Sequence, residues 1–445
     1  MQKESASLMP DYHPNIEIDS MKKTLLIVSL CSVLFSNCFS QKTVKQADAP
    51  ASQTILPGAS RIDVYLPLLK GKRIGVFANQ TSMVGNTHLV DTLRKRGVDI
   101  SIIFGPEHGF RGTASAGEKV GNYTDEKTGI PVVSLYGSKR VPSAEDFNKV
   151  DLLVFDIQDV GTRFYTYISS LEEFMNAAFE AGKPLMILDR PNPNGFYVDG
   201  PVLDLKYRSF VGRQAIPVVY GMTIAEYAMM IAGEKWLSAK ANERFAYYKT
   251  AQNSKDTPFH FQIIKCGNYT HKSLYQLPVR PSPNLPDMAS IYLYPSTCFF
   301  EGTVLSEGRG TATPFQVFGH PSLPKTLYSF TPNPTEGAKS SKNYGLVCYG
   351  WNVGGDPETV RKKLGGRIEL QYLIDAYKLF PDKDKFFILP SSGKMEESFF
   401  NKLSGNNDLW QQLKAGLSAD EIRESWKPGL EEFKKVRGKY LMYEE

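Results

Sequence analysis

Five short apolar runs in the first half of the chain each end in polar or charged residues. They cover residues 74–77, 100–104, 132–134, 152–155 and 185–188. Segments with apolar residues at helical spacing separate most of these runs, and this alternation is typical of a parallel sheet with helices on its faces. The pattern therefore predicts an α/β fold, and the polar residues after the strands are expected to meet at one edge of the sheet.

Local signals mark several helix ends. The helix predicted for residues 88–95 is followed by Gly97, a residue type common just past helix ends. Ser143 is placed to cap a short helix, and residues 165–181 carry apolar side chains along one helical face. These helices fall between predicted strands, as a parallel sheet requires.

Beyond a Pro-, Gly- and Asn-rich stretch at residues 191–212 the pattern is mixed. A capping box of Thr223 and Glu226 predicts the start of one helix. Residues 369–380 and 420–434 also favour helices, whereas residues 289–294 are strand-like. The second half is therefore predicted to be an α+β domain.

The N-terminus has the features of a targeting segment. A basic start at residues 21–23 precedes an apolar stretch at residues 24–35 that is too short to span a membrane easily. Small residues before Gln41 favour cleavage there, and lipidation of Cys38 is the alternative. Both outcomes predict export to the periplasm or cell envelope, with no transmembrane span later in the chain. The expected organisation is a leader at residues 1–40, a linker at 41–57, an α/β domain at 58–205 and an α+β domain at 206–445.

Composition and charge narrow the function classes. A hydrophobic content of 42% with 22% charged residues suits an ordinary globular protein. The net charge of +5, without a clustered basic run, argues against nucleic-acid binding. Outside the targeting segment the cysteines are Cys266, Cys298 and Cys348, whose odd number and wide spacing argue against a disulfide framework or a zinc site. The oligomeric state has no signature in the sequence.

The Gly-rich segment at residues 105–112 follows the second predicted strand and carries Glu107 and His108. Its glycines allow a tight turn around a carboxylate and an imidazole. Carboxylic acids that are partly removed from water at strand ends serve well as general acids. Glu107 is therefore a candidate acid, and Glu118 follows in the same long loop. In the alternative interpretation, Glu107 pairs with Arg111 and orders the loop.

A second cluster of polar residues follows the run at 152–155. It contains Asp156, Asp159, Arg163 and Tyr165. Buried charges need partners, so Asp156 either contributes to a site or holds Arg163 inside the protein. Tyr165 is suited to lining a sugar site, and a core position is the alternative.

Two more segments carry candidate binding residues. Arg190 and Asn192 follow the last run, and Asn192 lies between two prolines. A rigid hinge and a binding role are equally compatible with this segment. In the second half, Arg309 suits bidentate recognition of a carboxylate. Glu301 and Glu307 are either further site acids or ion-pair partners of Arg309.

Several familiar motifs are absent from the sequence. The loop after the first run lacks the G-x-G-x-x-G pattern, and the chain contains no P-loop, so no cofactor is expected. A metal site built from Glu107, His108, Asp156 and Asp159 is an alternative, because carboxylate and imidazole groups bind several divalent metals. His108 has no second histidine at ligand spacing, which weakens that alternative.

The chain resembles the exo-β-N-acetylmuramidases of the NamZ type, long described as a domain of unknown function. The resemblance extends from about residue 71 to the C-terminus. Several motifs in the same order carry it: Gly-Pro-Glu-His-Gly-Phe-Arg-Gly at 105–112, Phe-Asp-Ile-Gln-Asp-Val-Gly at 155–161, Arg-Phe-Tyr-Thr-Tyr at 163–167, Leu-Asp-Arg-Pro-Asn-Pro at 188–193, Tyr-Gly-Met-Thr at 220–223, Pro-Ser-Pro-Asn at 281–284, Phe-Glu-Gly-Thr at 300–303 and Ser-Glu-Gly-Arg-Gly-Thr at 306–311.

The resemblance implies a glycoside hydrolase that removes terminal N-acetylmuramic acid from the non-reducing end of peptidoglycan fragments. It implies a Rossmann-like domain followed by a smaller C-terminal domain, with the active site in the cleft between them. The glutamate of the first motif, Glu107, is the proposed catalytic residue of such enzymes. Cleavage of a glycoside also needs a second group at the anomeric carbon. Asp156, Glu118 and the substrate's own N-acetyl group are the candidates.

The lactyl carboxylate of muramic acid calls for a cation, for which Arg163, Arg190 and Arg309 are favoured. The other expected substrate contacts are His108, Tyr165, Asn192 and Glu301. The alternative function is a periplasmic protein that binds a sugar or muropeptide without turnover. Such proteins have two Rossmann-like halves, and the second half here lacks that alternation. A third interpretation is a hydrolase whose metal is held by Glu107, His108 and Asp156.

Overall fold

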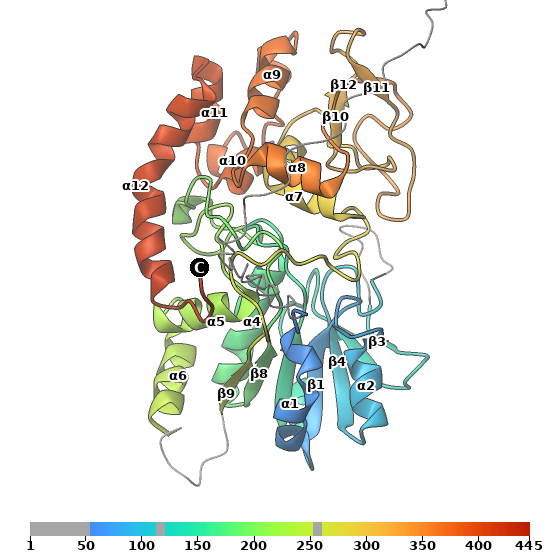
Figure 1. Ribbon diagram of the computed structural model, residues 1–445, viewed down its shortest axis with the longest axis vertical. Coiled ribbons are helices and arrows are strands. Elements are labelled where there is room, and N and C mark those ends of the chain that lie inside the picture. Colours follow the sequence, from blue (N-terminus) through green and yellow to red (C-terminus); the bar gives the residue numbers. More distant parts are fainter. Residues whose placement is uncertain (1–53, 113–120, 252–259) are drawn as a thin grey trace, which may run out of the picture. The chain divides into compact units, whose positions relative to one another are not determined.

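The computed structural model describes residues 54–112, 121–251 and 260–445 (Figure 1). The predicted leader and most of the predicted linker therefore lie outside the described residues, as does Glu118. In the described ranges, no helix combines the length and the apolar character needed to cross a membrane.

A seven-stranded sheet forms the first half, in the strand order β5-β6-β4-β1-β7-β8-β9. All neighbouring strands are parallel except the short edge strand β5. The five predicted strands are all present and the predicted α/β class is confirmed. The strands are β1 (Arg73–Ala78), β4 (Asp99–Gly105), β5 (Tyr123–Thr124), β6 (Pro131–Ser134), β7 (Leu152–Asp156), β8 (Leu185–Leu188) and β9 (Phe261–Ile264); a separate hairpin pairs β2 (Met83–Val84) with β3 (Thr87–His88).

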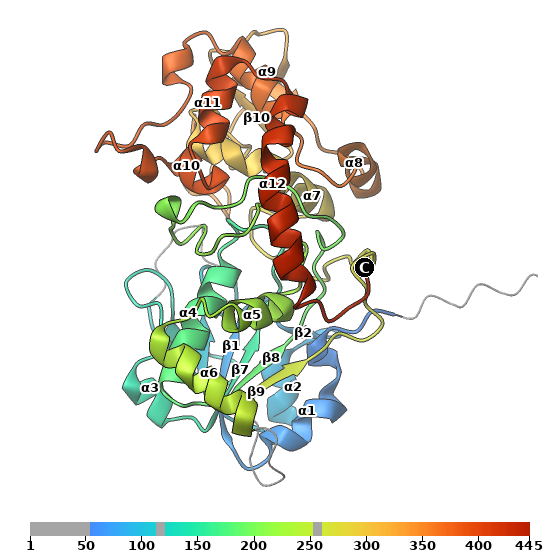
Figure 2. The same ribbon diagram turned by 90° about the vertical axis from the view of Figure 1, so that its left-hand side faces the viewer.

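Helices cover both faces of this sheet, as Figure 2 shows. The helices α1 (Ile62–Leu69) and α2 (Leu89–Lys95) lie on one face. The other face carries α3 (Ala144–Asn148), α4 (Tyr167–Glu180), α5 (Ile224–Gly233) and α6 (Ala239–Ala251). Ser143 caps α3 and Thr223 forms a capping box with Glu226 on α5, which confirms both predicted caps.

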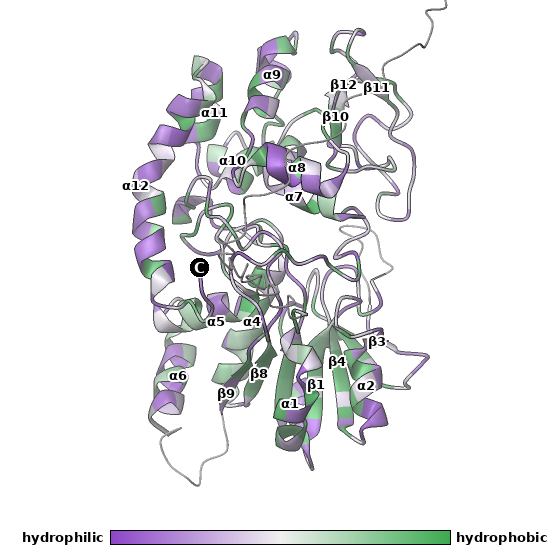
Figure 3. Ribbon diagram, viewed as in Figure 1, coloured by the Kyte–Doolittle hydropathy of each residue, from purple (hydrophilic) through white to green (hydrophobic). Residues whose placement is uncertain are grey.

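Successive side chains along the buried strands point to opposite faces of the sheet, so each face has its own hydrophobic core. Val76 and Val154 pack in the cluster beneath α1 and α2. Their neighbours Phe77 and Phe155 point to the opposite face, where their rings stack with centroids 4.9 Å apart. Phe174 of α4 closes over Phe77 at 5.0 Å. The strands are therefore apolar along nearly their whole length, as their colouring in Figure 3 shows, because both faces are covered.

The second half combines helices with a three-stranded antiparallel sheet, which agrees with the α+β prediction. Its strands are β10 (Val317–His320), β11 (Tyr328–Phe330) and β12 (Cys348–Asn352). Its helices are α7 (Met288–Thr297), α8 (Pro357–Leu364), α9 (Gln371–Leu379), α10 (Phe399–Ser404), α11 (Asp408–Ala415) and α12 (Ala419–Gly438). Short 3-10 turns are η1 (Gly58–Ser60), η2 (Leu205–Tyr207), η3 (Cys298–Gly302), η4 (Lys383–Lys385) and η5 (Met395–Glu397).

The strand prediction for residues 289–294 is wrong, because these residues lie within α7. Every residue of α7 is buried, so the helix has no polar face and its sequence shows no helical period. The helix start is nevertheless marked by a capping box of Asp287 and Ser290. That cap was the signal that could have separated a buried helix from a buried strand.

The predicted domain boundary at residue 205 falls before the last strand of the large sheet. Strand β9 follows that boundary and pairs in parallel with β8, with Leu185 opposite Phe261. The sheet therefore draws on chain from both sides of residue 205.

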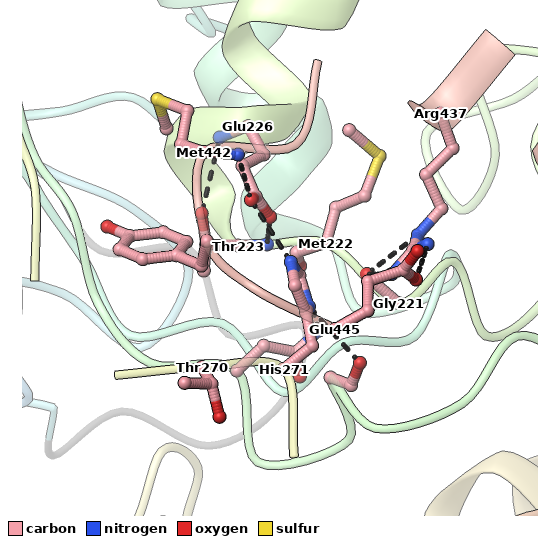
Figure 4. Close-up of polar contacts among 12 residues, drawn as sticks. Gly221, Met222, Thr223, Glu226, Thr270, His271, Arg437, Met442 and Glu445 are labelled. Atoms are coloured by element: carbon pink, nitrogen blue, oxygen red, sulfur yellow. Dashed lines mark hydrogen bonds and ion pairs between the residues drawn. The ribbon is translucent and has the colours of Figure 1, made fainter. Parts of the chain in front are cut away.

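Buried polar contacts fasten the C-terminal segment to the part of the chain that builds the large sheet and the helices around it (Figure 4). The Glu226 carboxylate accepts hydrogen bonds from the backbone N–H of Met442 at 2.7 Å and from Nε2 of His271 at 3.1 Å. Arg437 of α12 donates to the carbonyl of Gly221 from Nε at 2.9 Å and from Nη2 at 2.6 Å. Tyr443 donates to the carboxylate of the buried Asp189 at 2.5 Å.

Candidate active site

A cavity of about 460 Å³ lies beyond the carboxyl ends of β4, β6 and β7. This is the edge of the sheet at which parallel α/β folds place their sites. The first half contributes loops that follow these strands, and the second half contributes segments around Ser282, Glu301 and Arg309. Polar and aromatic side chains line it: Glu107, His108, Tyr136, Arg140, Tyr165, Thr166, Tyr167, Phe210, Ser282, Asn284, Glu301, Arg309 and Phe315 are among them.

Glu107 reaches the cavity because the chain turns sharply just after β4. His108 and Gly109 both adopt left-handed backbone conformations, with φ of 68° and 74°. A positive φ is uncommon for a residue other than glycine, and strained backbone conformations of this kind cluster at functional sites. The turn is tight enough that a Cβ at Gly105 would lie 3.1 Å from the backbone nitrogen of Phe110. The glycines of this motif therefore place Glu107, as predicted from the sequence.

Two hydroxyl groups contact the Glu107 carboxyl group from neighbouring loops. Tyr136, after β6, donates to Oε1 at 3.0 Å, and Thr166, at the start of α4, donates to Oε2 at 3.3 Å. Burial and the charge of Glu107 raise the pKa of Tyr136. Tyr136 therefore keeps its proton across the physiological pH range and serves as a donor to the carboxylate.

An aromatic wall stands beside this carboxyl group. The Tyr165 and Tyr167 rings meet edge to face with centroids 4.9 Å apart. Tyr165 donates to the carbonyl of Pro281 at 2.9 Å, so the wall is tied to the second half of the chain. His108 contacts the same segment of the second half, with its Nε2 3.4 Å from the Ser282 hydroxyl. Both Tyr165 and His108 line the cavity.

Another part of the cavity lining carries a cluster of paired charges. Arg309 binds Glu301 at 2.7 Å through Nη2 and Glu307 at 3.3 Å through Nε. Lys342 binds the other oxygen of Glu307 at 2.9 Å. Burial alone would raise the pKa of Glu307, but Lys342 and Arg309 hold it below its usual value. Glu301 and Arg309 face the cavity, whereas Glu307 is only 4% exposed and supports them from behind.

Asp156 does not share the cavity with Glu107, and this corrects the geometry expected from the sequence. Arg190 pairs with it through two hydrogen bonds, from Nε at 2.6 Å and from Nη2 at 2.8 Å. Their side chains are 0% and 1% exposed, and neither residue is among the described residues that line the cavity. Asp156 ends β7 and Arg190 follows the adjacent strand β8, so the pair joins two strand ends. The structure argues against Asp156 as the second catalytic group and against Arg190 as a substrate cation.

Arg163 and Asn192 are also structural in their contacts. Arg163 is fully buried and donates to the carbonyls of Pro201, Ile216 and Leu403 at 2.7–2.8 Å. Burial lowers its pKa to about 9. Asn192 donates to the carbonyl of Met222 at 2.8 Å and is 4% exposed. Irregular loops leave backbone carbonyls without partners, and these side chains supply the missing donors.

The proposed metal ligands are not brought together. Asp159 accepts hydrogen bonds from the Tyr220 hydroxyl at 2.5 Å and from the backbone N–H of Gly161 at 2.7 Å. Burial raises the pKa of Asp159 to about 7. Asp156 is bound to Arg190, so Glu107 and His108 are the members of the suggested set that face the cavity.

Several residues that line the cavity were not selected as site residues from the sequence. Tyr136, Arg140, Thr166 and Phe210 are among them. Tyr136 follows β6 directly, so its place after a predicted strand was the available signal. Phe210 and Arg140 carry no motif, and their contact across the chain is visible only in the fold.

Models of a single family match nearly the whole described chain. The N-terminal model of the exo-β-N-acetylmuramidase NamZ matches residues 74–289, and the C-terminal model matches residues 292–443. The chain belongs to this family. Membership confirms the resemblance noted in the sequence and the enzyme class expected from it, a glycosidase.

Related proteins agree with this assignment. The peptidoglycan β-N-acetylmuramidase NamZ of Bacillus subtilis strain 168 is 40% identical over 404 residues, which cover 86% of this chain and 90% of that protein. A crystal structure of a DUF1343 family protein from Bacteroides fragilis superposes with a TM-score of 0.75 at 44% identity, covering 88% of this chain and 99% of the other. A second DUF1343 structure from that organism gives 0.69 at 26% identity, covering 89% and 100%.

Proposed function

We propose that the protein is an exo-β-N-acetylmuramidase that releases N-acetylmuramic acid from the non-reducing ends of peptidoglycan fragments, with Glu107 as general acid. The observation that carries the acid assignment is the position of Glu107 in the cavity, beyond the end of β4 and between the Tyr136 and Thr166 hydroxyls. The Bacillus subtilis relative is named for activity on peptidoglycan, which supports the substrate class.

Glycoside cleavage needs a proton for the leaving oxygen and a second group at the anomeric carbon. In the proposed reaction, protonated Glu107 gives its proton to the oxygen of the breaking bond. Glu301 is the other carboxylate among the described residues that line the cavity, so it joins Glu118 and the substrate's N-acetyl group as a candidate for the second task. Tyr136 and Thr166 each contact one oxygen of Glu107 and fix the orientation of its carboxyl group.

The test uses purified protein and a chromogenic β-N-acetylmuramide, with products of a muramyl-terminated disaccharide identified by mass spectrometry. Glu107→Gln keeps the shape of the side chain but carries no acidic proton, so turnover is expected to fall by roughly 100-fold or more. Circular dichroism checks that the variant is folded. Wild-type rates in Glu107→Gln would refute the acid assignment, and binding without turnover by the wild type would favour the sugar-binding alternative.

We also propose that the enzyme acts outside the cytoplasm, in the turnover of cell-wall fragments. The support is the basic and apolar pattern at residues 21–35 followed by small residues before Gln41. Mass spectrometry of the mature protein from cell fractions tests this. A mature chain that begins at Gln41 supports cleavage after residue 40, and a chain that begins with a lipid-modified Cys38 supports the anchored alternative.

A further inference from the structure

Arg140 is a cation at the cavity wall, and no carboxylate of the residues that the structure describes forms an ion pair with it. Its side chain is exposed and lines the cavity beside Tyr136. Within the described residues, no carboxylate lies at ion-pair distance from it. Arg140 affects Glu173 from farther away, and that carboxylate is itself paired with Arg213 at 2.6 Å. Arg140 is therefore available to an anion that enters from solution.

The orientation of Arg140 is set by an aromatic platform. Its Cζ lies 4.3 Å from the centroid of the Phe210 ring, a cation–π contact. A cation–π contact does not use the guanidinium N–H groups as donors to an oxygen acceptor, so these groups stay available to other partners. Those N–H groups match the two oxygens of a carboxylate.

The loop that carries Phe210 is braced from the core. Ser169 of α4 donates to the carbonyl of Phe210 at 2.7 Å. On either side of Phe210, Arg208 and Arg213 donate to Oε1 of Glu172 at 3.2 and 2.9 Å. Glu172 is 0% exposed, so both arginines are anchored to a buried carboxylate. The platform under Arg140 is thus held by contacts that do not depend on a ligand.

We infer that Arg140 is the specificity-determining residue that binds the carboxylate of the substrate's lactyl ether. This inference rests on the proposed function, since that ether is what distinguishes N-acetylmuramic acid from N-acetylglucosamine. Arg309 is the rival cation in the cavity, but it is already bound to Glu301 and Glu307. A substrate carboxylate at Arg309 would compete with two carboxylates of the protein, whereas at Arg140 it meets no such competitor from the described part of the chain.

The test compares Arg140→Gln and Arg140→Lys with wild type on the chromogenic muramide. Loss of a charge-assisted contact is expected to lower kcat/KM by roughly 10- to 150-fold in Arg140→Gln, mainly through KM. The kcat/KM of Arg140→Lys is expected to lie between those of the wild type and Arg140→Gln, because lysine keeps the charge without the planar guanidinium. Lys149→Gln is the matched control: it removes an exposed cation at the end of α3 that does not line the cavity, and a change below about fivefold is expected.

A second readout is independent of turnover. The inhibition constants of free N-acetylmuramic acid and N-acetylglucosamine are measured with each variant. Arg140→Gln is expected to raise the inhibition constant of N-acetylmuramic acid by the same factor as KM and to leave that of N-acetylglucosamine unchanged. Equal losses for both sugars, or a selective loss in Arg309→Gln with none in Arg140→Gln, would overturn the assignment. If the wild type fails to cleave any muramide, the proposed function itself fails, an outcome distinct from normal cleavage by Arg140→Gln.

Discussion

Substitution of Asp156 by asparagine is expected to lower the free energy of unfolding and to leave catalytic turnover largely unchanged. In the wild type, Arg190 meets Asp156 through two short hydrogen bonds, and both side chains are almost fully buried. Asparagine keeps the size of the side chain but removes the charge, so the guanidinium of Arg190 is left buried without its counter-charge. Breaking a buried ion pair in this way costs about 3–5 kcal/mol of the free energy of unfolding.

The assay measures two quantities on the same preparations. Urea unfolding followed by circular dichroism gives the loss in the free energy of unfolding, and the chromogenic muramide gives kcat/KM per folded molecule under native conditions. Asp156→Asn is expected to lose stability and to keep turnover within an order of magnitude. Glu107→Gln is expected to show the reverse, since Glu107 is partly exposed at the cavity.

The double variant Asp156→Leu with Arg190→Met separates charge from packing. Replacing both partners of a buried pair by apolar groups is often close to neutral, so this variant should be more stable than Asp156→Asn. A residual cost is expected because Arg190 also donates to the carbonyl of Met83 at 3.1 Å. A folded Asp156→Asn protein with wild-type stability and the low turnover of Glu107→Gln would refute this reasoning. That result would support Asp156 as the second catalytic group.

Three further substitutions test other parts of the structure. Burial raises the pKa of the Asp159 carboxyl to about 7 in the folded protein, well above its ordinary value of 3.8, so the native state holds a proton there that the unfolded chain releases. The free energy of unfolding is therefore expected to fall as pH rises from about 4 to 7, and Asp159→Asn should flatten this part of a urea-unfolding pH series. Glu226→Gln leaves a poorer acceptor for the backbone N–H of Met442, so hydrogen exchange at that amide is expected to quicken while amides of the large sheet keep their protection. A Cβ at Gly161 would lie 2.2 Å from Oδ1 of Asn192 at a backbone φ of +79°, so Gly161→Ala should lower the melting temperature in a thermal scan.

Local signals explain which parts of the fold were predictable from the sequence. The five parallel strands are apolar on both faces, and the caps at Ser143 and Thr223 depend on residues three positions apart. Glu107 was predictable for the same reason, because a Gly-rich turn directly after a strand places it at the sheet edge. Helix α7 was not, since complete burial removes the polar face that distinguishes a helix from a strand.

The partners of strand-end charges depend on strand order, which the sequence does not state. Asp156 and Arg190 pair because β7 and β8 are neighbours in the sheet. The same pattern of a charge after a strand describes Glu107, whose strand β4 is followed in the sheet by β6 and its Tyr136. Asp156 has an arginine partner after the neighbouring strand and is buried, whereas Glu107 has hydroxyl partners and lines the cavity. The sequence pattern alone does not distinguish these two cases.

The buried charges nevertheless contribute to the site through rigidity. Arg163 links carbonyls of residues 201, 216 and 403, so one side chain holds loops from both halves of the chain. General acid catalysis depends on reach within hydrogen-bond distance of the leaving oxygen, and small displacements of the acid reduce it strongly. The Glu107 turn lies in the first half, while Glu301 and Arg309 come from the second. Buried contacts between the halves, such as those of Arg163 and Tyr165, therefore set the geometry in which the acid on one side meets a substrate held by the other.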